Sequence, residues 1–268
     1  DAVDVHEALK DVHAVKVRGI VIERRGKHFF KVERLRAAKP DEFDIKRLLP
    51  VGKYEPEKLL EMYGKRVDGL KDEALRNFFQ EKILDDEAFA EMLMNAPGGK
   101  LWHHTYLGGL LEHSLAVHRI CLSTSIIYPE ADRDLLLAAA LLHDIGKIFE
   151  FSMDIHIDYT IKGRLMGHIY LGAEWISNNA AEYLPQDKLE HLVHMLLSHH
   201  GEGEMGSPVK PMSLEANILH HADLMDSQTN AFARVIGREK DSGETFSKWV
   251  KTADRFLYLK PYIDEDEE

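Results

Sequence analysis

Cysteine is nearly absent from this chain of 268 residues, because Cys121 is the only one. No disulfide can therefore form within the chain, and we expect a reducing compartment, the cytoplasm. Long hydrophobic runs are also missing, since no apolar stretch reaches the roughly 18 residues that a membrane-spanning helix needs. No charged leader followed by an apolar run opens the chain either. These absences exclude a disulfide-stapled extracellular domain and predict a chain that is not held in a membrane.

Positive charge is the next shortage. The chain has 34 lysines and arginines against 46 acidic residues, a formal net charge of -12. A broad nucleic-acid-binding surface would need clustered Lys and Arg, so this balance argues against one. Part of the acidic excess lies in the final stretch "DEDEE", which we expect to be a solvated tail. A small polyanion can still enter a cleft whose metal ions reverse the local field.

The residues that are present predict a small β-containing piece followed by a helical domain. Before Pro40, the strand-like stretches "AVKVRGIVIE" and "KHFFKVERL" flank "RRGK", where Gly26 can supply the positive φ of a hairpin turn. Residues 1–10 are expected to be helical. The predicted organisation is an N-terminal piece at 1–39, a proline-punctuated linker at 40–56, a helical domain at 57–260 and an acidic tail at 261–268.

The fold class that follows is mainly all-α. Breaks fall at Pro97-Gly98-Gly99, at Pro129, at Pro185 and in the Gly- and Pro-rich segment "GEGEMGSPVKP". Between these breaks, apolar residues recur with a helical period. The helices expected from this pattern span 57–63, 71–84, 87–94, 101–127, 133–149, 164–181, 187–199, 213–226 and 244–259.

Histidine is the residue in unusual abundance. The chain has 16 histidines, and most of them lie between His103 and His221. Histidine is neither a strong helix former nor a common core residue, so this crowding on helices needs a reason. A single histidine on an apolar helix is more often a hydrogen-bonded core residue than a metal ligand. As a set with nearby aspartates, however, these residues predict a metal site.

The predicted metal ligands lie on successive helices. They are His113, His143, Asp144, His168, His199, His200 and Asp223. Asp144 has two carboxylate oxygens and can bridge two ions, whereas each imidazole binds one. One ion would take His113, His143, Asp144 and Asp223. The second would take Asp144, His168 and one or both of His199 and His200, and which of these two binds the ion directly is left open. Mixed imidazole and carboxylate ligands suit Mn, Fe, Co, Ni or Zn better than Mg or Ca.

Lys147 lies one helical turn after His143 and Asp144 in "HDIGK". Its ordinary role would be that of an exposed helix cation. Beside two metal ions it could instead bind a non-bridging phosphoryl oxygen and stabilise charge in the transition state. Gly146 is expected to leave room for a substrate that approaches closely.

The motifs "HHTYLGGLLEHSLAV", "DRDLLLAAALLHDIGKIFE", "GRLMGHIYLGAEWI", "LSHHGEGEMGSPVKPMSLEA" and "LHHADLMDSQTNAF" resemble the HD superfamily of metal-dependent phosphohydrolases. More closely, they resemble the bacterial 3′-to-5′ exoribonucleases of the YhaM type. The resemblance implies an HD-domain helical bundle, metal-ligand roles for the residues named above, a phosphate contact for Lys147 and a substrate contact for His104. It also implies an N-terminal OB-fold of five strands, of which residues before Pro40 resemble only the last part.

The function implied is removal of nucleoside monophosphates from the 3′ end of single-stranded RNA, with single-stranded DNA as a second candidate substrate. A two-metal mechanism would supply hydroxide near neutral pH, and Asp144 and Lys147 would be its catalytic residues. Mn is the favoured metal. An alternative keeps the metal site but acts on a cyclic dinucleotide or another small nucleotide. A third is a non-catalytic module that binds a nucleotide or a protein. The oligomeric state stays open.

Five further histidines fall outside the ligand pattern and are expected to have structural roles. They are His118, His156, His191, His194 and His221.

Overall fold

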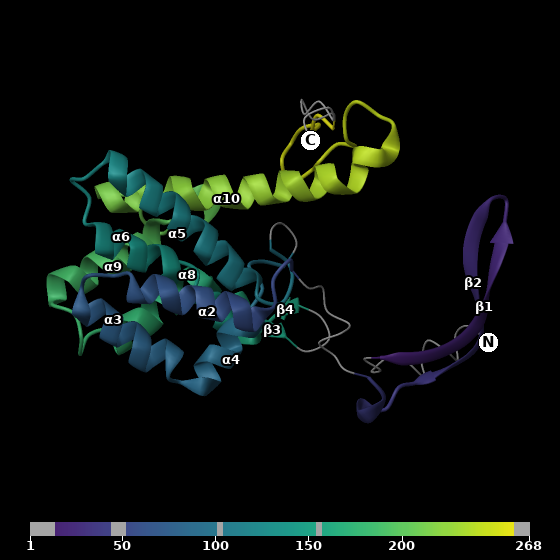
Figure 1. Ribbon diagram of the computed structural model, residues 1–268, viewed down its shortest axis with the longest axis horizontal. Coiled ribbons are helices and arrows are strands. Elements are labelled where there is room, and N and C mark those ends of the chain that lie inside the picture. The colour runs from purple at the N-terminus through teal and green to yellow at the C-terminus, as the bar shows by residue number, and fades with distance from the viewer. Residues whose placement is uncertain (1–13, 44–51, 101–103, 154–156, 260–268) are drawn as a thin grey trace. The chain divides into compact units, whose positions relative to one another are not determined.

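The computed structural model describes residues 14–43, 52–100, 104–153 and 157–259 (Figure 1). The chain divides into two compact units, residues 1–49 and residues 50–268. The finer division at 39/40, 56/57 and 260/261 stays a prediction. The helix expected at 1–10, the tail at 261–268, His103 and His156 lie outside the described residues.

The N-terminal unit contains a long antiparallel hairpin of β1 (Val15–Arg24) and β2 (Lys27–Ala37). Arg25 and Gly26 form the two-residue turn with φ values of 52° and 72°, which confirms the hairpin turn expected at Gly26. The pairing shifts register between Arg18 and Gly19. A side chain at Gly19 would place its Cβ 2.1 Å from the Lys31 carbonyl oxygen, so only glycine fits this bulge. A short 3-10 helix, η1 (Pro40–Glu42), follows.

The second unit is built from helices, which confirms the mainly all-α fold class. Its helices are α2 (Pro56–Asp68), α3 (Glu73–Phe79), the π-helical turn η3 (Gln80–Leu84), α4 (Glu87–Asn95), α5 (Gly109–Ile127), α6 (Arg133–Leu142), α7 (Lys147–Glu150), α8 (Ile161–Asn179), α9 (Gln186–Ser198), the 3-10 turn η4 (Gly203–Met205), α10 (Leu214–Glu239) and the 3-10 turn η5 (Lys240–Ser242). A two-stranded ribbon of β3 (Phe151–Met153) and β4 (Ile157–Tyr159) joins α7 to α8.

Side-chain caps explain where several of these helices begin. Asp72, Asp86 and Asp132 each accept a hydrogen bond from the backbone N–H three residues ahead, at the starts of α3, α4 and α6. Thr160 and Ser213 do the same for α8 and α10. Each cap satisfies a backbone donor that the first turn of a helix leaves without an intrahelical acceptor.

Helix α6 forms the centre of the core. All of its residues from Leu135 to Leu142 are buried. It packs against α5, α9 and α10, and α2 and α4 pack against α5. The Tyr63 hydroxyl donates to the Leu141 carbonyl oxygen at 3.1 Å, so α2 is tied to the end of α6. The chain therefore leaves α6 at His143 in the interior of the bundle.

Two of the expected helices begin or continue differently. The helix expected from residue 101 begins at Gly109, because Gly108 has a φ of 73°, which a right-handed helix does not allow. The helix expected over 133–149 is broken, since residues 143–146 form a tight turn between α6 and α7. Both departures occur next to predicted ligands.

The C-terminal part differs most from the expected pattern. Helix α10 continues to Glu239, well beyond the expected end at residue 226. The helix expected at 244–259 is wrong, because this segment folds back on itself through the bridges Phe246↔Tyr258 and Val250↔Arg255. Its apolar residues Leu257 and Leu259 are buried in this extended form, so tertiary packing overrides the helical period. In Figure 1 the segment lies at the end of α10.

None of the helices in the described ranges is long and apolar enough to cross a membrane.

Candidate metal centre

The centre of the site is the turn that follows α6. His143 caps the C-terminus of α6, and its backbone N–H donates to the Ala139 carbonyl oxygen at 2.8 Å. Asp144 follows and is 1% exposed. An ionised carboxylate at this depth is costly unless positive charge or hydrogen-bond donors surround it. The apolar sequence of α6 thus fixes a His-Asp pair in the core.

Four other elements bring the remaining predicted ligands to this turn. His113 lies on α5, His199 caps the C-terminus of α9, His200 follows it, and Asp223 lies on α10. His168 lies on α8 directly after Gly167, whose φ of 72° and ψ of 155° interrupt the helix. The interruption leaves the His168 backbone N–H to donate to Glu150 Oε1 at 3.1 Å. All seven predicted ligands therefore lie in one region.

Four of the five histidine rings share one orientation. Each holds Nδ1 against an acceptor: His113 against Asp226 Oδ2 (2.7 Å), His143 against the Ala140 carbonyl (3.0 Å), His168 against Glu150 Oε1 (3.3 Å) and His199 against the Leu196 carbonyl (2.6 Å). These acceptors place the proton of each neutral ring on Nδ1. The Nε2 atoms then carry lone pairs, which is the arrangement of histidines that bind metals.

One half of the site gathers around His113 and His143. Their Nε2 atoms lie 3.1 Å apart. Nε2 of His113 is also 3.1 Å from Asp223 Oδ1 and 3.4 Å from Asp144 Oδ2. Two lone pairs and two carboxylate oxygens at such distances repel one another unless a proton or a metal ion lies among them. This half therefore has the chemistry of a cation site.

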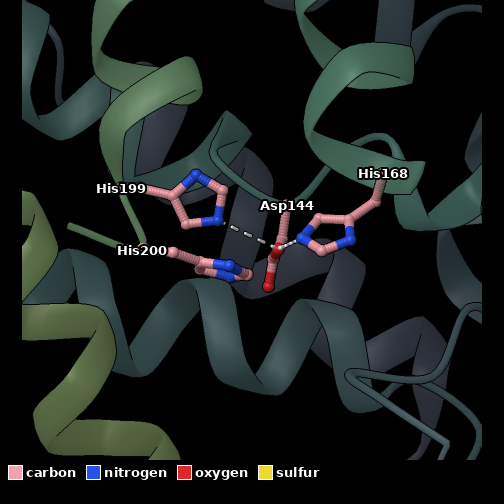
Figure 2. A group of neighbouring side chains, drawn as sticks. All are labelled: Asp144, His168, His199 and His200. Carbon is pink, nitrogen blue, oxygen red and sulfur yellow. Dashed lines mark ion pairs between the residues drawn. The ribbon is translucent and has the colours of Figure 1, made fainter. Parts of the chain in front are cut away.

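The other half gathers on the second oxygen of the Asp144 carboxylate. Asp144 Oδ1 lies 3.3 Å from His168 Nε2 and 3.5 Å from His199 Nε2. Figure 2 shows both rings directed at this carboxylate from different helices, with the His200 ring beside them. These three atoms are buried, and none makes a hydrogen bond to any residue that the structure describes. Together with His200 they form a group of four candidate ligands.

The pKa shifts reflect the same arrangement. Burial raises the pKa of Asp144, but Lys147 and His143 outweigh it and hold this pKa well below its usual range. Burial disfavours the charge of His113, yet Asp144, Asp223 and Asp226 raise its pKa well above the ordinary value. Burial, together with the charges of His199 and His168, lowers the pKa of His200 to about 3. A cation is favoured at His113 in the first half, and neutral imidazoles are favoured at His199 and His200 in the second.

These observations fit a divalent-metal centre. Buried polar atoms without hydrogen bonds are rare, and three of them that converge on one point indicate a ligand that satisfies them. The donors are imidazole nitrogens and carboxylate oxygens, the set that first-row transition metals bind. The residues present thus form a His/Asp cluster of the metal-binding kind. The assignment of individual residues to one ion or the other stays a prediction.

Lys147 lies beside the cluster. It begins α7 and is 6% exposed. Its Nζ donates to Asp144 Oδ2 at 2.6 Å and to the Gly98 carbonyl oxygen. Gly146 does not leave room for a substrate, because a Cβ there would lie 2.0 Å from the His168 carbonyl oxygen. The space beside Gly146 is filled by the backbone of α8, so this glycine allows α7 and α8 to pack closely.

His104 lies next to His113 and is 2% exposed. Its Nδ1 pairs with the Tyr106 hydroxyl at 2.7 Å, and its Nε2 pairs with Asp226 Oδ2 at 3.0 Å. The same Asp226 oxygen holds His113. The predicted substrate contact of His104 stays a prediction, and this geometry links His104 to the site through Asp226.

Two carboxylates of the site were missed in the sequence. Asp226 holds the rings of His113 and His104, and Glu150 binds both the backbone and the ring of His168. Asp226 follows Asp223 by three residues on the same helix face, a spacing that could have identified it. Glu150 has no comparable signal, because its contact with His168 depends on how α7 packs against α8.

Other histidines play supporting roles. His191 pairs with Ser213 Oγ at 2.8 Å, and His194 Nε2 accepts from the Met212 backbone N–H at 3.1 Å. These contacts connect α9 to the start of α10. His220 Nδ1 donates to the His199 carbonyl oxygen at 2.8 Å and so fixes the turn that carries the His199/His200 pair.

Comparison with known proteins places the chain in a family. Residues 110–228 match the HD domain family. The chain is 32% identical over 266 residues to the 3′-5′ exoribonuclease YhaM of Oceanobacillus iheyensis, which covers 98% of this chain and 82% of that protein. It is also 32% identical over 255 residues to the proteins of the same name from Listeria welshimeri and Listeria innocua, covering 93% of this chain and 79% of each. No solved structure matches the chain significantly. With this identity over nearly its whole length, the chain belongs to the family of the YhaM 3′-5′ exoribonucleases and contains an HD domain.

Proposed function

We propose that this protein is a metal-dependent 3′-5′ exoribonuclease that hydrolyses the terminal phosphodiester bond of single-stranded RNA. The observation that carries the proposal is the convergence of four histidine Nε2 atoms on Asp144. Membership of the YhaM family supports the substrate class. The proposal places the enzyme in the cytoplasm, where RNA is available. The single cysteine, Cys121, is a free and buried thiol, which suits that reducing compartment.

The cluster has enough ligands for two ions that share Asp144. His113, His143 and Asp223 would complete one set, and His168 with His199 and His200 would complete the other. When bound, divalent ions would supply Lewis acidity and lower the pKa of a coordinated water toward neutrality. The mixed nitrogen and oxygen ligands suit Mn, Fe, Co, Ni or Zn, and we favour Mn.

Lys147 would bind the substrate phosphate. Its ammonium group lies against Asp144 at the wall of a cavity next to the cluster. From there it can donate a hydrogen bond to a non-bridging phosphoryl oxygen, where negative charge accumulates in the transition state. The bond from phosphorus to the O3′ of the preceding nucleotide breaks, and a water oxygen replaces it. The products are a nucleoside 5′-monophosphate and an RNA with a new 3′ hydroxyl.

A nuclease assay tests this proposal. A 5′-labelled single-stranded oligoribonucleotide is incubated with the metal-free protein and with Mn, Co, Zn or Mg in parallel. We expect a ladder of products that shorten from the 3′ end, release of mononucleotides, and dependence on the metal. Single-stranded DNA of the same sequence and a cyclic dinucleotide serve as competing substrates. Turnover of the cyclic dinucleotide without shortening of RNA would overturn the proposal in favour of a small-nucleotide phosphodiesterase.

An Asp144→Ala variant tests whether the activity depends on the cluster. We expect it to fold but to lose bound metal and activity together, because both halves of the cluster depend on this carboxylate. Asp68→Ala, at the exposed end of α2, serves as a control that should retain both. Undiminished RNA shortening by Asp144→Ala would contradict the assignment of the site.

A further inference from the structure

A cavity of about 310 Å³ lies against the metal centre. Lys147, His200 and Asp223 form part of its wall. The rest of the wall comes from His220 and the turns of α10 that follow Asp223, and from residues of the segment 244–259 that folds back at the end of α10. The cavity thus connects the cluster to a part of the chain that has no role in holding it.

Two side chains give this outer wall its character. Phe232 of α10 is half-buried, and the Arg255 guanidinium lies over its ring, 5.9 Å from the ring centre. Gln228 and Thr252 add neutral polar groups. An aromatic ring paired with a guanidinium is a surface on which nucleobases stack, and this kind of stacking accepts every base. An enzyme that removes one nucleotide after another needs such tolerance.

The charges along the wall agree with an anionic ligand. Lys147 and Arg255 are the cations among the lining residues, and Asp223 is the acid. Asp223 also lies 3.1 Å from His113 Nε2, so its charge belongs to the metal cluster. A phosphate at the Lys147 end and a base at the Arg255 end would match this distribution.

We propose that Phe232 and Arg255 bind the 3′-terminal nucleobase of the RNA while its phosphate lies at the metal centre. This inference rests on the proposed exoribonuclease function and names the residues that bind the 3′-terminal nucleotide. The volume is at the lower end of the roughly 300–1,000 Å³ range of ligand pockets, so it suits a single nucleotide. A pocket that accepts one nucleotide beyond the scissile bond selects a free end, which gives exonuclease rather than endonuclease action.

Single substitutions test the pocket. Phe232→Leu keeps an apolar side chain but removes the stacking surface, and Arg255→Gln removes the guanidinium. We expect each to lower kcat/KM on a single-stranded oligoadenylate in Mn by about tenfold, within the range for loss of one stacked base. Phe232→Tyr should restore activity. Phe256→Leu and Arg238→Gln, which are exposed and do not line the cavity, are the matched controls and should behave as wild type.

A change in the RNA separates base binding from a structural effect. An oligoadenylate whose 3′-terminal residue is abasic lacks the group that Phe232 is proposed to bind. We expect wild type to cleave it about tenfold less efficiently than intact RNA, and Phe232→Leu to show no such difference. Melting temperature and metal content, measured for each variant, check that the fold and the cluster are retained.

The outcomes distinguish the two proposals. If wild type releases no mononucleotides from RNA, the proposed function fails and this inference fails with it. If wild type releases them but Phe232→Leu matches Phe256→Leu, the pocket assignment alone is overturned. Equal losses from the missing base in wild type and in Phe232→Leu would overturn it as well.

Discussion

Helix α5 carries two buried histidines, five residues apart, in opposite electrostatic surroundings. His113 is fully buried among Asp144, Asp223 and Asp226, which raise its pKa well above the ordinary value. His118 is 3% exposed, and burial together with Arg66 and Arg133 lowers its pKa to about 4. Neither ring nitrogen of His118 makes a hydrogen bond within the residues that the structure covers.

The difference shows that burial of a histidine does not make it a metal ligand. Carboxylates around an imidazole create a place for a cation, whereas arginines around it exclude one. The surroundings of His113 direct its Nε2 lone pair toward the other ligand atoms of the cluster. The surroundings of His118 keep its ring neutral and apart from any carboxylate. Substitutions at the two positions should therefore separate function from stability.

The largest effect is expected at His113. His113→Gln removes an Nε2 donor from the carboxylate-rich half of the cluster, and we expect nuclease activity to fall on the order of 100- to 1,000-fold. Metal content, measured by elemental analysis after gel filtration, should fall with it. His118→Gln on the same helix is the matched control and should keep both metal and activity. Equal losses in the two variants would show that α5 contributes packing alone.

The second comparison is between His199 and His200. His199 Nε2 lies 3.5 Å from Asp144 Oδ1, and its Nδ1 is fixed by the Leu196 carbonyl oxygen. We expect His199→Gln to weaken metal binding by more than the roughly 10- to 100-fold typical for loss of a residue that orients a ligand. His200→Gln should weaken it less. Metal titration of both variants, followed by competition with a chelator, measures the order, and the reverse order would assign His200 as the stronger ligand.

A smaller loss is expected for the residues that hold the rings. Asp226→Asn and Glu150→Gln keep the shape of each side chain but weaken its hold on His113 and on His168. We expect metal affinity to fall by about 10- to 100-fold in each case. Glu174→Gln on α8, whose half-buried carboxylate pairs with Lys162 and Tyr170 and not with the cluster, is the control and should leave the affinity unchanged. Affinities equal to wild type in both variants would show that the backbone alone orients the rings.

Much of this site could be predicted because its ligands carry their own chemistry. His143 and Asp144 follow an apolar run, and His113, His168 and Asp223 stand on helices whose apolar period marks the core. Such residue types leave few alternatives to a metal site. The helical fold follows from the same period, and the hairpin follows from the strand-like stretches on either side of Arg25 and Gly26.

The parts that could not be predicted depend either on local backbone geometry or on contacts between distant segments. The turn at residues 143–146 and the start of α5 at Gly109 are set by local backbone geometry that the apolar period does not encode. Residues 244–259 have helical spacing, yet the Ser247 backbone N–H donates to the Leu257 carbonyl oxygen at 2.8 Å in a folded-back segment. Phe232 and Arg255 meet only because of that fold, so their pairing has no sequence signal.

The smallest effect is expected at His118 and concerns pH rather than activity. Because its folded pKa of about 4 lies below the unfolded value, the unfolded chain takes up a proton first as the pH falls through 6.5. Stability is therefore present near neutral pH and is lost as the pH drops from 6.5 toward 4. Between pH 7 and pH 5, metal-free wild type should lose about 1–2 kcal/mol more unfolding free energy than His118→Leu. Urea unfolding of both proteins in a chelator measures this difference, and His221→Gln, at an exposed position of α10, should follow wild type. Parallel curves for wild type and His118→Leu would mean that burial and the nearby arginines do not hold the His118 ring neutral, which would remove the contrast between the two histidines of α5.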